Sequence, residues 1–159
     1  YEIQFGDWSS DVCSSDLVGD RLTHQPSRTV TETDNLMFSA MTHNMQPLHL
    51  DVEYAKASEF GQILVNSTFT FSLAVGLSIA DTTVGTLIAN LGFDKVVTPK
   101  PTFIGDTLTC HTEVVEKRDS NSRPGHGIVV FRHELTNQRG ETALSMLRTV
   151  MLKPSPATT

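Results

Sequence analysis

The chain has 159 residues, which suits one domain with a single sizeable core, and it carries 18 acidic and 12 basic residues. Four of the acids and none of the bases fall in residues 1–17, so the rest of the chain holds 14 against 12 and predicts no strongly charged partner. The sequence has no stripe of lysine and arginine residues of the kind that binds nucleic acid. Its strongest apolar run, 69–80, is too short to span a membrane. These features favour a cytoplasmic protein.

The N-terminal segment needs separate treatment. Residues 7–17 read Asp-Trp-Ser-Ser-Asp-Val-Cys-Ser-Ser-Asp-Leu, which matches the in-frame translation of a common sequencing-adapter oligonucleotide. We therefore interpret 1–17 as a non-native segment and exclude it from fold reasoning. The alternative is a polar tail that would be disordered. Without this segment Cys110 is the one remaining cysteine, and its alternating, strand-like surroundings predict a core residue.

The first predicted elements are short. Residues 28–33 alternate β-branched residues and predict a strand. Thr33 or Asp34 would then cap a helix that runs to about Met41. A second helix is expected over 47–58, because Pro47 is preorganised for the first helical position.

The longest predicted helix, 69–81, follows the capping residues Asn66, Ser67 and Thr68. Apolar residues surround it almost completely, so we expect it to be buried. Strands are predicted at 86–97, 106–118, 127–137 and 142–153, and 154–159 reads as a frayed tail. One buried helix followed by four antiparallel strands is an α+β arrangement in which a curved sheet wraps around the helix, as one domain over 18–153.

The segment 42–51 concentrates polar chemistry around a proline. It reads Thr-His-Asn-Met-Gln-Pro-Leu-His-Leu-Asp and places His49 in the first turn of a helix, beside its donor-rich end. That is a suitable place for acid/base chemistry on a polarised carbonyl. Structural explanations stand beside this one: His49 could be satisfied by local hydrogen bonds, Asn44 could be a turn former, and Asp51 could be an acid favoured by the helix dipole.

This segment resembles the signature of the MaoC-like hydratases, the (R)-specific enoyl-CoA hydratase family, which reads Gly-Asp-x-Asn-Pro-Ile/Leu-His. Pro47, Leu48 and His49 match it directly. The family's Gly, Asp and Asn positions hold His43, Asn44 and Gln46. The similarity covers roughly 18–153 and continues through four further stretches: 59–61, 65–67, 103–108 and 137–141.

The resemblance implies a hot-dog fold, a homodimer or higher homo-oligomer with the active site at the subunit interface, and a hydro-lyase that adds or removes water across the α,β-double bond of an enoyl-CoA. It implies no cofactor beyond the CoA of the substrate. His49 and the residue at position 44 would share proton transfer, and a backbone N–H near Asn66 and Ser67 would contact the thioester oxygen. Since an amide such as Asn44 is not a general base at neutral pH, His49 would act alone or with Asp51 or Glu53. The other option is a subgroup that uses a different proton route for the same class of reaction.

Two arginines of the loop 117–125, Arg118 and Arg123, are candidates to contact the CoA phosphates, because a guanidinium suits bidentate phosphate binding. A solvated hairpin loop is the alternative. If the acyl group carries a second carboxylate, as in mesaconyl-CoA or itaconyl-CoA, an arginine could pair with it. The histidines are not spaced with acidic residues or cysteines in a way that indicates a metal site.

Two other functions remain open. A hot-dog thioesterase would use Asp51 or Glu53 to activate water at the thioester carbon. A non-catalytic acyl-CoA-binding protein would explain why Asn44 replaces the family's acid. Free thiol would reveal the thioesterase, and acyl-CoA binding without turnover would reveal the binding protein.

Overall fold

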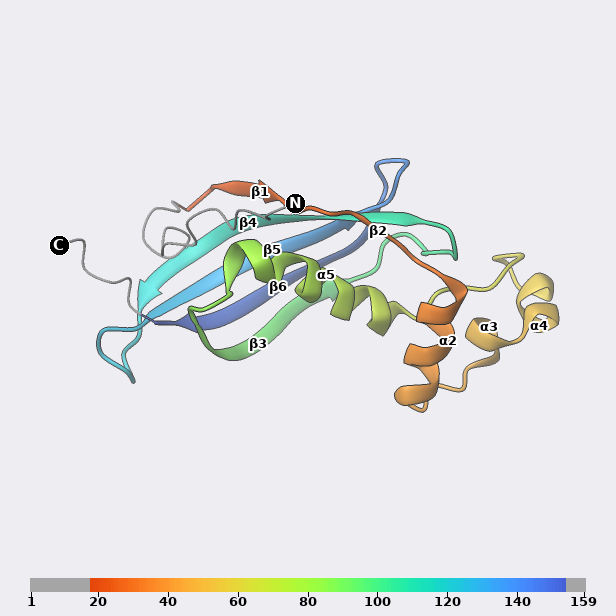
Figure 1. Cartoon of the computed structure of the whole chain (residues 1–159), viewed down its shortest axis with the longest axis horizontal. Coiled ribbons are helices and arrows are strands. Elements are labelled where there is room, and N and C mark those ends of the chain that lie inside the picture. Colours follow the sequence, from red (N-terminus) through yellow and green to blue (C-terminus); the bar gives the residue numbers. More distant parts are fainter. Residues whose placement is uncertain (1–17, 154–159) are drawn as a thin grey trace, which may run out of the picture.

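The computed structural model describes residues 18–153. The predicted non-native segment 1–17 and the predicted frayed tail 154–159 lie outside the described residues. A long antiparallel sheet curves around one helix, and three shorter helices gather beyond one end of that sheet (Figure 1). This confirms the predicted α+β class with a curved sheet around a long helix.

The strand order in the sheet is β1-β4-β5-β6-β3, with β2 pairing beside β1 along β4, and every pairing is antiparallel. The four long predicted strands are confirmed within a residue or two, whereas β1 was not predicted. The strand predicted over 28–33 is wrong beyond its first two residues, because the chain turns there to start a helix. The bounds are β1 (Arg21–Thr23), β2 (Arg28–Thr29), β3 (Leu87–Val97), β4 (Thr107–Asp119), β5 (Gly127–Thr136) and β6 (Thr142–Leu152).

The helices are α2 (Glu32–Met41), α3 (Pro47–Leu50), α4 (Val52–Ala57) and α5 (Ser67–Thr82). Thr31, rather than Thr33 or Asp34, caps α2, and Asp34 completes a reciprocal capping box with it. The helix predicted over 47–58 is wrong as one unit. Asp51 is extended there, and its carboxylate accepts hydrogen bonds from the N–H groups of Glu53 and Tyr54, so a new helix begins.

Helix α5 lies along the concave face of the sheet (Figure 1). Its buried residues are Thr70, Ala74, Ser78 and Thr82, which recur every fourth position on one face. Small side chains on this face let the helix approach the strands closely, while its larger apolar residues pack against the core from the flanks. The expectation that α5 is buried all round is therefore wrong within a single chain: one side of the helix stays open, with Ile79 38% exposed.

A buried polar layer divides the core into two apolar clusters. His24 Nδ1 lies 2.6 Å from Asp81 Oδ2, and His24 Nε2 lies 2.6 Å from Thr112 Oγ1, which is 2.7 Å from His133 Nδ1. Fully buried Arg148 donates to the side chain of Asn90. Cys110 lies in the larger cluster, where burial raises the pKa of its thiol to about 12; this confirms the predicted core residue.

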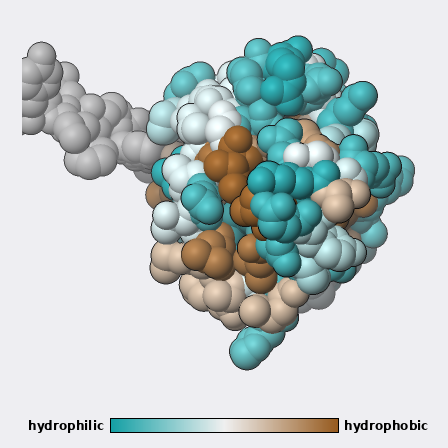
Figure 2. Space-filling view, turned by 90° about the vertical axis from the view of Figure 1, so that its right-hand side faces the viewer, coloured by the Kyte–Doolittle hydropathy of each residue, from teal (hydrophilic) through white to brown (hydrophobic). Residues whose placement is uncertain are grey.

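Two exposed surfaces are apolar. Figure 2 shows apolar side chains gathered on the end of the molecule that carries α2, α3 and α4. A second set lies on β3, the edge strand of the sheet. The large apolar residues exposed in these elements are Leu36, Met37 and Met41 of α2, Val52 and Tyr54 of α4, Met45 before α3, and Leu91, Phe93, Val96 and Val97 of β3.

Candidate active site

The end of α2 places Asn44. His43 has φ +54°, the left-handed conformation that glycine adopts most readily, and it stands where the family's pattern has glycine. The His43 N–H donates to Ala40 O, and the Asn44 N–H donates to Ser39 O at 2.9 Å. This pair of bonds is a Schellman motif, which ends the helix and fixes Asn44 three residues before the start of α3. Asn44 is half-buried, and its side-chain oxygen accepts a long 3.4 Å bond from the Gln46 N–H.

Helix α3 places His49. Pro47 occupies the first turn, as predicted, and His49 Nδ1 lies 2.8 Å from the carbonyl oxygen of Leu64. A carbonyl can only accept, so Nδ1 carries the hydrogen and the neutral ring keeps an unprotonated Nε2. This contact therefore fixes the tautomer in which Nε2 is available as a base.

The first turn of α5 offers one free amide. The Thr68 N–H donates to Asn66 Oδ1, and the Phe69 and Thr70 N–H groups donate to Asn66 O. The Asn66 N–H is also bound, to the side chain of Asn35. Within the described residues, the Ser67 N–H has no such partner. It points from the positive end of a helix of 16 residues, which is a favourable position for a developing oxyanion.

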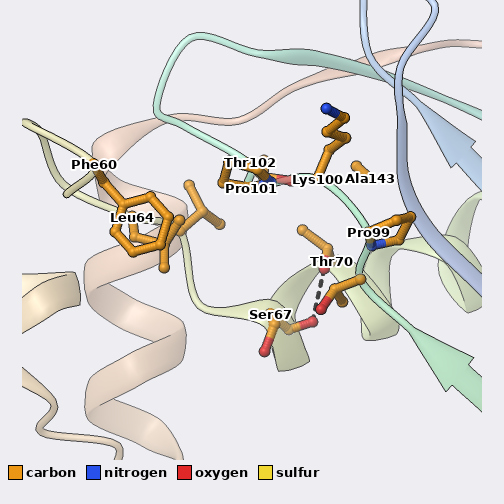
Figure 3. Close-up of a pocket in the computed structure, with 11 residues that line it drawn as sticks. Phe60, Leu64, Ser67, Thr70, Pro99, Lys100, Pro101, Thr102 and Ala143 are labelled. Atoms are coloured by element: carbon orange, nitrogen blue, oxygen red, sulfur yellow. Dashed lines mark hydrogen bonds between the residues drawn. The ribbon is translucent and has the colours of Figure 1, made fainter.

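A cavity of about 310 Å³ lies at this end of α5 (Figure 3). Its wall includes Ser67 and also Leu64, whose carbonyl binds the His49 ring. Figure 3 shows Lys100 rising from the Pro99–Pro101 stretch, with its amine directed away from Ser67 and Thr70. The cavity lining is Phe60, Leu64, Val65, Ser67, Thr70, Thr98, Pro99, Lys100, Pro101, Thr102 and Ala143.

The MaoC like domain, a known protein family, matches residues 14–135 of this chain. The chain belongs to this family. The domain is 30% identical over 148 residues to the mesaconyl-CoA hydratase of Cereibacter sphaeroides, covering 89% of this chain and 43% of that protein. It is 28% identical over 153 residues to the beta-methylmalyl-CoA dehydratase of Chloroflexus aurantiacus, covering 89% and 41%. The MaoC-like domain thus spans less than half the length of these two relatives.

Solved structures agree with this assignment. A monoamine oxidase regulatory protein from Archaeoglobus fulgidus aligns with a TM-score of 0.81 at 36% identity, covering 91% of this chain and 95% of that one. A double-hotdog-fold protein from Mycobacterium tuberculosis aligns with a TM-score of 0.80 at 23% identity, covering 91% of this chain and 44% of that one. The predicted hot-dog fold is confirmed.

Within the MaoC-like domain, the structure brings His49, Asn66 and Ser67 to one end of α5, with Asn44 on the same stretch of chain as His49. Asp51 follows α3, but its carboxylate is exposed and caps α4. Its catalytic role stays a prediction, and so does the role of Asn44.

The two arginines lie elsewhere. Arg118 is near the end of β4 and donates to Glu116, and Arg123 follows in the β4–β5 connection. The other end of β4, at Thr107, follows the cavity-lining segment 98–102 in the chain. The eleven-residue step along the strand from Thr107 to Arg118 spans about 36 Å. One chain therefore does not bring these arginines to His49, and their phosphate contact stays a prediction.

Sequence reasoning missed Asn35, Ser39 and the cavity-lining residues 98–102. Asparagine and serine are unfavourable inside a helix, so Asn35 and Ser39, four positions apart, were a signal for side-chain hydrogen bonding. Nothing comparable marks 98–102, which reach the cavity through tertiary folding. Among residues 18–153, no group of three or more His, Cys, Asp or Glu side chains could hold a metal ion. No helix in that range is long and apolar enough to cross a membrane.

Proposed function

We propose that this MaoC-like domain catalyses the reversible addition of water to the α,β-double bond of an enoyl-CoA thioester. The observation that carries the proposal is that a free amide donor, the Ser67 N–H, belongs to a residue that lines the cavity, while the His49 imidazole is fixed as an acceptor by the carbonyl of Leu64, which lines the same cavity. Hydration of an unsaturated thioester needs these two functions, an oxyanion donor and a proton-transfer group.

In the proposed mechanism, His49 Nε2 takes a proton from water as the water oxygen bonds to the β-carbon. The π electrons move onto the thioester oxygen, where the Ser67 N–H and the α5 dipole stabilise the enolate. His49 then returns the proton to the α-carbon, so one base completes a syn addition. The Asn44 amide can hold the water or donate to the thioester oxygen, but it cannot replace His49 as the base.

We further propose a branched dicarboxylic acyl group, of the mesaconyl type, as the substrate. The names of two relatives, a mesaconyl-CoA hydratase and a beta-methylmalyl-CoA dehydratase, support this choice. The cavity wall combines apolar residues with three threonines, Thr70, Thr98 and Thr102, which suits a short polar acyl group better than a long alkyl chain.

We also propose that two copies pair through β3. This strand is a free edge of the sheet, and four large apolar residues on it are between 38% and 54% exposed. An exposed apolar edge is a site of association, and a subunit paired there would also approach the open side of α5.

The alternatives have less support. A thioesterase would need a carboxylate to activate water, and the carboxylate of the candidate Asp51 instead accepts the N–H groups that cap α4. The alternative that needs a test is a non-catalytic acyl-CoA-binding protein, because Asn44 stands where the family has an aspartate that takes part in proton transfer.

The test follows the enoyl-thioester absorbance of crotonyl-CoA and mesaconyl-CoA, with a thiol reagent in parallel. We expect loss of the enoyl band without free thiol, and His49→Ala should lower kcat by about 10² to 10⁴-fold because it removes the general base. His126→Ala, in the distant β4–β5 connection, is the matched control and should keep full activity. Full activity in His49→Ala, or release of thiol by the native protein, would refute the proposal.

A further inference from the structure

Helix α2 buries polar side chains and exposes apolar ones. Its two buried residues are Asn35 and Ser39, one turn apart, while Leu36, Met37 and Met41 are more than half exposed. A helix held by apolar packing shows the reverse distribution. The buried face of α2 is therefore used for hydrogen bonding.

Asn35 uses both ends of its amide. Its Nδ2 donates to the main-chain carbonyl of His49 at 2.9 Å, and its Oδ1 accepts from the Asn66 N–H at 2.9 Å. The residue is only 2% exposed, so water does not compete for either bond. Asn66 returns a bond to α2 by donating from Nδ2 to Ser39 Oγ at 3.2 Å.

These bonds connect the segments that carry the two groups of the proposed reaction, the His49 imidazole and the Ser67 N–H. One bond holds the residue that carries the imidazole, and the other holds the residue directly before the Ser67 N–H. The second bond also engages the Asn66 N–H, so Ser67 is left as the single free amide at the start of α5 within the described residues. Asn35 thus links α3 to α5 across a separation of 17 residues in sequence between His49 and Asn66.

We propose that Asn35 is a positioning residue that fixes the spacing between the His49 imidazole and the Ser67 N–H. It touches neither substrate nor reacting atoms and acts through these two groups. The inference rests on the proposed hydration reaction. Since a displacement of about 1 Å in such a site costs about a hundredfold in rate, a buried amide that sets this spacing controls kcat.

Asn35→Asp is the sharpest variant because it preserves shape. One carboxylate oxygen still accepts from the Asn66 N–H, but the other oxygen now faces the His49 carbonyl, acceptor against acceptor. We expect kcat to fall about a hundredfold at pH 8 while KM changes little. As the pH falls, the new carboxyl group gains a proton and can donate to the His49 carbonyl, so the ratio of variant to native kcat should rise.

Ser78→Ala is the matched control, because it removes a different buried hydrogen bond, from Ser78 Oγ to Val75 O, at a distance from the site. It should lower stability without lowering kcat. An Asn35→Asp enzyme with kcat within about threefold of the native value, or with a pH-independent ratio, would overturn the proposal.

A second readout does not depend on turnover. Nitrogen-15 chemical shifts of the His49 ring report which nitrogen carries the hydrogen, and we expect the native Nδ1–H form to be lost in Asn35→Asp as α3 moves away from Leu64. If the native protein hydrates no enoyl-CoA, the proposed function fails and these shifts alone decide the positioning role. Identical His49 shifts in the native and variant proteins would refute it.

Discussion

His133 occupies the middle of the polar layer that crosses the sheet. Burial, together with the smaller effects of the charges of Arg148 and His24, lowers its pKa from 6.5 to about 3. Its Nε2 has no hydrogen-bond partner among the described residues, and neither has Arg148 Nη1. Arg148 is itself fully buried, and burial lowers the pKa of its guanidinium. The fold therefore keeps His133 neutral beside a buried cation.

This pKa makes stability depend on pH. Between pH 6.5 and about 3 the unfolded chain binds a proton at His133 that the folded chain excludes, so the free energy of unfolding falls as the pH falls. The slope is at most about 1.4 kcal/mol per pH unit from this group. His133→Asn, whose amide can keep the bond to Thr112, should remove that component.

Urea unfolding at several pH values between 4 and 7 gives the free energy of unfolding of the native protein and of His133→Asn. The carboxylates titrate in both proteins, so their contribution cancels in the difference between the two free energies. Parallel stability curves for the native protein and His133→Asn would contradict the assignment.

At the scale of the secondary-structure element, Asp51 separates α3 from α4. Its Oδ1 accepts from the N–H groups of Glu53 and Tyr54 at 2.9 and 3.0 Å, which satisfies the first turn of α4. The sequence also makes this carboxylate a candidate for proton transfer. The two roles differ in whether the negative charge is needed.

Asp51→Asn and Asp51→Ala separate these roles. The amide of Asp51→Asn keeps an acceptor oxygen for the cap, so we expect native stability and native kcat. Asp51→Ala removes the cap and should lower the free energy of unfolding by about 1 kcal/mol. Thermal unfolding and enoyl-CoA hydration, measured on the same preparations, give both values. A large loss of kcat in Asp51→Asn would instead establish the carboxylate as catalytic.

At the scale of the whole molecule, the free edge of β3 and the open side of α5 define one region that a second copy would cover. Leu91→Lys places a charge on this edge, where burial against another subunit would cost its hydration. We expect the mass in solution to fall from that of two or more chains to that of one.

Light scattering coupled to size-exclusion chromatography makes this measurement. Val18→Lys adds the same charge near β1, on the opposite side of the sheet, and should leave the mass unchanged. An unaltered mass in Leu91→Lys would move the interface away from β3.

The sequence alone determines the long strands, α5 and the family of this domain. Apolar and polar residues alternate around Cys110 and predict β4, and the apolar run after the capping residue Asn66 predicts α5. Both signals can be read locally, because the periodicity of side chains and the capping of helices involve only a few neighbouring residues. The same local chemistry identifies Pro47 as a helix start and places His49 just inside it. A signature of adjacent residues is enough for these predictions.

Tertiary structure decided the rest. The polar face that α5 turns to the sheet and the amide bridge from Asn35 to His49 and Asn66 both depend on groups that are distant in sequence. Arg118 and Arg123 suit phosphate chemically, but the length of β4 carries them away from the site. Residue types fix which bonds a side chain can make, whereas the folded chain fixes which partners lie within reach, and hydrogen bonding requires both.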